Sequence, residues 1–177
     1  ACLKFAVGDT ASTLADAIFG SVPERGSLDL SMGAVAYAIQ IYGDFFGYTL
    51  LARGAARLFS IELNVNFLTP YFSRSPREFW QRWHISLSTW FRDYLYIPLG
   101  GKKLRFTSTL LTMAVAGAWH GFGWNFLAWG LYHGAWVLIC HYWPSGARPG
   151  TLAWKTALAP LQAVATFVIV SFGDRKS

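Results

Sequence analysis

Charged residues are unevenly distributed, and long uncharged stretches separate the charged segments. No Asp, Glu, Lys or Arg occurs in residues 106–147, and none occurs in residues 156–173. A transmembrane helix needs about 20 mostly apolar residues. The first stretch is long enough for two passes and the second for one, so the pattern predicts an all-α, polytopic membrane protein.

The N-terminal third of the chain is predicted from its turns and its polar positions. Residues 9–19 fit a short helix. Residues 31–58 are apolar but carry several polar side chains, so they make a poor simple span. Among them, Asp44 should face a protein interior or a water-filled cavity, because a carboxylate facing lipid is costly. Residues 64–76 are predicted to be an irregular connection, with Pro76 well suited to begin a helix.

The segment before the first uncharged stretch combines rings with ionisable groups. At 100° per residue, one arc of a helix over residues 79–94 is mostly aromatic and apolar. Glu78 and Arg82 stand on the opposite side at a favourable i,i+4 spacing. Such a helix would lie at the membrane surface or against a bundle, and Pro98 would end it. The aromatic arc carries Trp80, Trp83, His84, Leu87, Phe91 and Tyr94.

The net charge of +6 is explained by topology. Lys102, Lys103 and Arg105 flank an uncharged stretch, as cations in short cytoplasmic loops do, and we therefore expect no nucleic-acid partner. From that side, one helix would run outward over residues 106–119, turn at a Gly-flanked HGFGWN segment, and return over residues 126–143. His120 would then lie in the outer half of the membrane or at the floor of a cavity open to that side.

Four histidines are the candidate reactive groups. His84 and His120 could act as general bases near neutral pH, or they could be hydrogen-bonded structural groups. His133 and His141 fit packing at the membrane interface. No H-x-x-x-H pair and no C-x-x-C occurs, so no metal site is predicted. No G-x-S-x-G elbow is present, so a Ser-His hydrolase is not predicted. Ser86 and Ser88 are instead expected to bond their own helix backbone.

Two long motifs occur in order: NFLTPYFSRSPREFWQRWHISLSTWFRDYLYIPLGG and LLTMAVAGAWHGFGWNFLAWGLYHG. They closely resemble the membrane-bound O-acyltransferase family, in its bacterial alginate O-acetyltransferase branch. The resemblance covers roughly residues 31–140 and is densest over residues 66–134. It implies a multi-pass helical bundle around a central cavity, of which residues 1–177 would be a single, partial domain of a longer protein.

The resemblance also implies roles for individual residues. His120, in the W-H-G motif, would be the catalytic residue and act as general base on the accepting hydroxyl. His84, in the R-W-H-I-S-L-S motif, would orient that hydroxyl or polarise the carbonyl of the acyl thioester. Four residues would contribute to substrate binding: Asp44, Tyr48, Trp119 and Asn125.

The family transfers an acyl group, acetyl in this branch, to hydroxyls of an extracellular polysaccharide such as alginate. This implies a protein of the bacterial inner membrane that contacts membrane lipid, a polysaccharide acceptor and extracytoplasmic acetyltransferase partner proteins. The acyl donor would be acetyl-CoA or another acyl thioester, with no bound cofactor. The residues leave open an alternative, a non-catalytic membrane scaffold or conduit for polysaccharide export in which the histidines are structural.

Overall fold

The computed structural model describes residues 4–20, 26–142 and 159–173, and all regular elements in these residues are helical. The all-α prediction is therefore confirmed for the described part of the chain. The chain forms two compact units, the first ending at Asn66 and the second running from Phe67 to Gly173.

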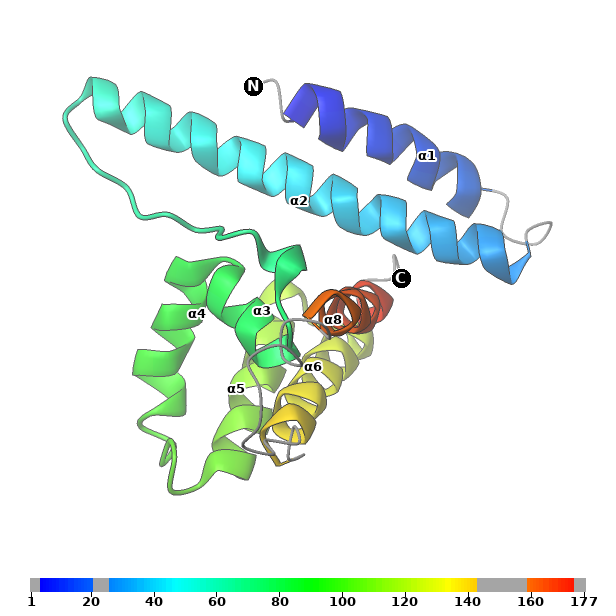
Figure 1. The fold of residues 1–177 in the computed structure, drawn as a ribbon. Coiled ribbons are helices and arrows are strands. Elements are labelled where there is room, and N and C mark those ends of the chain that lie inside the picture. Colours follow the sequence, from blue (N-terminus) through cyan, green and yellow to red (C-terminus); the bar gives the residue numbers. More distant parts are fainter. Residues whose placement is uncertain (1–3, 21–25, 143–158, 174–177) are drawn as a thin grey trace. The chain divides into compact units, whose positions relative to one another are not determined.

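The first unit is a pair of antiparallel helices. A π-helical turn, η1 (Lys4–Gly8), leads into α1 (Asp9–Phe19), which lies along α2 (Ser27–Leu58) (Figure 1). Close approaches fix the direction, since Gly33 of α2 faces the Ile18 side chain while Gly43 faces the backbone of Gly8. Small residues in α2 thus allow α1 and η1 to pack closely against it.

Asp44 of α2 points into this first unit. Its carboxylate lies against Gly8, and its Oδ1 atom is buried without a hydrogen-bond partner among the described residues. The prediction that Asp44 faces the protein interior is confirmed. Tyr48, one turn further along α2, is 65% exposed.

The second unit begins with a short 3-10 turn, η3 (Pro70–Phe72), followed by α3 (Pro76–Arg82). The Ser75 side chain caps α3 by accepting a hydrogen bond from the Glu78 amide, which satisfies one of its unpaired N–H groups. Glu78 also forms an ion pair with Arg82 at 2.6 Å. The predicted helix start and the predicted i,i+4 pair are both confirmed.

The prediction of one continuous helix over residues 79–94 is wrong. The backbone leaves α3 at Trp83, adopts a left-handed conformation at His84 (φ 40°, ψ 59°), and resumes as α4 (Ile85–Phe91). Left-handed backbone is unfavourable for a residue with a Cβ. The break is held by Ser88, whose hydroxyl donates to the Trp83 carbonyl (3.1 Å) and whose amide donates to the His84 carbonyl (3.0 Å).

The break changes which residues share a face. After α4 the chain continues as a π-helical turn, η4 (Arg92–Tyr96). Tyr94, predicted on the same arc as His84, is 69% exposed and packs on Trp90, 5.4 Å away between ring centroids. Phe91 is buried, as expected of that arc.

Two antiparallel helices, α5 (Arg105–His120) and α6 (Trp124–Tyr142), form the centre of the second unit (Figure 1). The predicted turn at the Gly-flanked segment separates them. A Cβ placed on Gly117 would meet the Phe126 backbone, and one on Gly130 would meet the carbonyl oxygen of Met113. The two backbones therefore approach closely because glycine stands at the contacts.

The last described helix, α8 (Ala159–Gly173), packs against this centre. The Tyr132 hydroxyl of α6 donates to the Ile169 carbonyl (2.9 Å), and Phe167 packs edge-on to Tyr71. Helices are thus found in all three predicted spans. Among the described residues, however, no helix combines the length and the apolar character that a membrane crossing requires.

Two glycines give a test of the α5–α6 packing in the full-length parent protein. Gly130→Ala is expected to lower the unfolding temperature, because overpacking typically costs about 1–3 kcal/mol. Gly54→Ala, on α2 where nothing lies within 4 Å of the added Cβ, is the matched control and should stabilise by about 0.5–1 kcal/mol. Thermal unfolding of both purified variants checks this, and equal shifts would contradict the packing.

Candidate functional site

The two histidines singled out in the sequence belong to one cluster of rings. The His84 ring lies 6.5 Å from the Trp119 ring, measured between centroids, and the Trp119 ring lies 5.0 Å from the His120 ring. His120 in turn packs edge-on to Trp129 at 5.0 Å. Residues far apart in the sequence are therefore brought together at one end of the α5–α6 pair.

Both histidines stand where a helix starts or ends. His120 is the last residue of α5, and Gly121 follows it with an extended backbone that ends the helix. His84 precedes α4 at the left-handed break. His120 is exposed, whereas His84 is half-buried. A non-glycine residue held in a left-handed conformation costs energy and persists only where its surroundings enforce it, which is common at functional sites.

The electrostatics of the cluster favour a neutral His84. Burial, and after it the charge of the nearby His120, lowers the pKa of His84 from its usual 6.5. His84 lies between α3 and α4, outside the predicted spans. At neutral pH its imidazole therefore carries one N–H donor and one acceptor nitrogen.

The predicted substrate-binding residues are divided between the two units. Trp119 is 57% exposed, and its ring packs edge-on against both histidine rings. Asn125 is exposed in the first turn of α6, with its side-chain oxygen folded over Gly123. Asp44 and Tyr48 belong to the first unit, and their part in binding substrate stays a prediction.

The ring cluster extends further than the sequence reasoning found. His133 of α6 is fully buried, and its ring contacts Trp129 at 4.7 Å, Trp80 at 5.3 Å and Tyr132 at 5.3 Å. His133 therefore packs among aromatic rings inside the second unit, and its position relative to the membrane interface stays a prediction. The i,i+4 spacing of Trp129 and His133 could have indicated a shared face on α6, but not that α3 would cover it.

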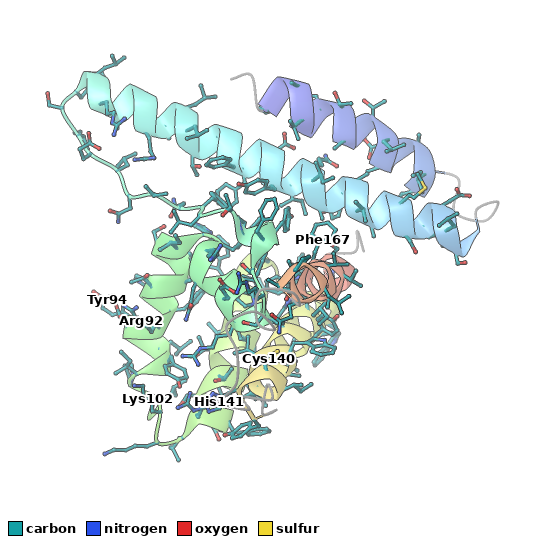
Figure 2. All side chains as sticks on the ribbon, viewed as in Figure 1. Arg92, Tyr94, Lys102, Cys140, His141 and Phe167 are labelled. Carbon is teal, nitrogen blue, oxygen red and sulfur yellow. The ribbon has the colours of Figure 1, made fainter. Side chains whose placement is uncertain are left out.

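The remaining histidine lies at the far end of α6. His141 is exposed, and Nη1 of Arg105 lies 3.5 Å from its Nδ1 atom. Figure 2 shows His141 and Cys140 on α6, with Lys102 at the same end of the unit. Cys140 is a free thiol and is half-buried.

The arrangement offers acid–base chemistry. One exposed imidazole and one half-buried, neutral imidazole both pack against a partly exposed indole, which suits proton transfer from a hydroxyl. Within residues 4–20, 26–142 and 159–173, no three His, Cys, Asp or Glu side chains gather as metal ligands would.

Comparison with known proteins places this chain in a family. The family model described as MBOAT, membrane-bound O-acyltransferase family, matches residues 21–174. The chain is 41% identical over 175 residues, 96% of its length, to a probable alginate O-acetylase of Azotobacter vinelandii, of which it covers 34%. It is equally identical to the Pseudomonas aeruginosa protein of the same name, of which it covers 32%.

The name of a third relative refers to a different polymer. The chain is 35% identical over 161 residues, 85% of its length, to a peptidoglycan O-acetyltransferase of Helicobacter pylori, of which it covers 31%. The chain thus spans about a third of the length of these curated relatives. Since the family model matches most of its residues, the chain belongs to the membrane-bound O-acyltransferase family.

Proposed function

We propose that the parent protein is an O-acetyltransferase of the bacterial inner membrane that acetylates hydroxyls of an extracellular polysaccharide such as alginate. The observation that carries the proposal is the ring cluster in which His84 and His120 both pack against Trp119. Family membership supports acyl transfer, and the names of the relatives support acetyl as the group and a surface polymer as the acceptor.

In the proposed reaction the donor is acetyl-CoA or another acyl thioester. The acceptor oxygen attacks the thioester carbonyl carbon while His120 takes the hydroxyl proton. The tetrahedral intermediate then collapses, the C–S bond breaks, and the leaving sulfur receives the proton from His120. His84 orients the acceptor or donates a hydrogen bond to the carbonyl oxygen, where negative charge develops.

The proposed setting is a multi-pass protein with Lys102, Lys103 and Arg105 on the cytoplasmic side. His120, at the opposite end of α5 from Arg105, would then face the extracytoplasmic side where the polymer lies. Extracytoplasmic acetyltransferase proteins are the proposed partners.

Deleting the gene of the parent protein tests the proposal against the export alternative. Without the protein, ester-linked acetate per unit of surface polysaccharide should fall to background while the amount of polymer at the surface is kept, and restoring the gene should restore acetate. Unchanged acetate would refute acetyl transfer. A loss of surface polymer with normal acetate on what remains would support a scaffold or conduit instead.

The lowered pKa of His84 predicts the pH dependence of the reaction. A positively charged His84 would disfavour the protonation of His120 that base catalysis requires, so activity should be lost as pH falls through the pKa of His84. Because that pKa lies below 6.5, the contribution of His84 to the acid limb of kcat/KM should have its midpoint below pH 6.5, in addition to the loss that protonation of His120, the proposed base, causes by itself. Returning acid-treated enzyme to neutral pH should restore activity, and an acid limb of the same shape in His84→Gln would contradict this electrostatic picture.

A further inference from the structure

His133 poses a chemical problem that the proposed reaction leaves unanswered. Its ring is fully buried in the second unit, and neither ring nitrogen has a hydrogen-bond partner among the described residues. Buried polar groups in folded proteins are almost always hydrogen-bonded, and each exception calls for an explanation. A phenylalanine would fill the same aromatic surroundings without this cost, so packing alone does not account for a histidine.

A second unpaired polar atom lies beside it. The Nε1 atom of Trp80 is also buried without a partner in the described part of the chain, and its ring packs edge-on to His133 with 5.3 Å between centroids. Trp80 comes from α3 and His133 from α6, so the tertiary fold brings the two groups together. One shared ligand would pair both.

The chemistry of the two groups defines that ligand. The indole N–H can only donate, whereas a neutral imidazole has an acceptor nitrogen as well as a donor. A group joining them must accept from Trp80. A hydroxyl oxygen can then either donate to the acceptor nitrogen of His133 or accept from its N–H, so it fits both tautomers, whereas a carbonyl oxygen fits only when the N–H of His133 points toward it. Two hydrogen bonds of about 2.8–3.0 Å through one oxygen can connect nitrogens about 5 Å apart, and the two ring centroids lie 5.3 Å apart.

We propose that His133 and Trp80 form an internal binding site for one hydroxyl oxygen, supplied by a water molecule or by the acceptor substrate. The site lies one ring behind His120, because Trp129 packs on both His133 (4.7 Å) and His120 (5.0 Å). An oxygen held there fixes the position of His133 and, through its contact with Trp129, supports the ring that packs on His120. Of the two sources of the oxygen, only the acceptor substrate depends on the proposed function; a water molecule does not.

Two substitutions at position 133 in the purified full-length parent separate hydrogen bonding from packing. His133→Phe keeps a ring and removes both nitrogens, while His133→Gln removes the ring and keeps hydrogen-bonding atoms. If the proposal holds, His133→Gln lowers stability or acceptor binding less than His133→Phe does. If His133 only fills space, His133→Phe has the smaller effect. Trp80→Phe should resemble His133→Phe, with Trp83→Phe on the same segment as the matched control, since no atom of Trp83 is buried and unpaired.

The readouts identify the source of the oxygen. If it is water, the unfolding temperature without substrate falls more for His133→Phe than for His133→Gln. If it is the acceptor hydroxyl, the unfolding temperatures do not follow this order, but the acceptor KM of His133→Phe and Trp80→Phe rises about tenfold, the loss of about 1.4 kcal/mol of binding. The proposal is overturned if Phe is as mild as Gln, or milder, in both measurements. The unfolding measurement needs no activity, so it stands apart from any failure of the proposed function.

Discussion

Replacing His120 by Ala in the full-length parent should lower acetyl transfer about 10²–10⁴-fold, the usual contribution of a general base. Its level in the membrane should stay that of the parent, because His120 is exposed at the end of α5 and its loss opens no buried cavity. Ester-linked acetate on the polysaccharide and the membrane level of the protein are measured together.

His141→Ala is the matched control for this substitution. His141 is also an exposed histidine at the end of a helix, but it lies at the opposite end of the α5–α6 pair. It should keep full acetyl transfer. Acetate retained in His120→Ala would refute the base assignment, and acetate lost together with the protein would favour the structural alternative.

The second large effect is expected at His84, where the side chain and the backbone can be separated. Both His84→Ala and His84→Gly remove the imidazole, so both should lower acetyl transfer about 10²-fold or more. Glycine adopts left-handed backbone without penalty, whereas alanine there costs about 1–2 kcal/mol. The Gly variant should therefore unfold at a higher temperature than the Ala variant.

This pair of variants has two ways to fail. Full activity in either one would show that the imidazole has no part in the reaction. A Gly variant less stable than the Ala variant would show that the left-handed conformation at position 84 (φ 40°) places no strain on the fold.

Much of the helical layout could be predicted from the sequence. Glycines around residues 121–123 marked the turn between α5 and α6, and Ser75 with Pro76 marked the start of α3. These signals are local, since caps and turns depend on a few neighbouring residues. The break at His84 could not be predicted in this way, because the aromatic periodicity runs through it unbroken and the hydrogen bonds of Ser88 decide the path.

The candidate site was predictable only in part. The resemblance singled out His84 and His120, but their shared contact with Trp119 depends on the tertiary fold, which brings the break between α3 and α4 to the end of α5. The burial of His133 likewise depends on Trp80 covering α6. No pattern within one segment can specify which segment will cover it.

A double-mutant cycle on His84 and His120 tests most directly the central claim that the two residues serve one acyl-transfer site. Acetyl-transfer rates are compared for the parent, His84→Gln, His120→Gln and the double variant at matched protein levels. Residues that act as a unit are strongly non-additive, so the double variant should be no slower than the slower single variant. Losses that multiply would show that the two histidines act independently and would contradict the account.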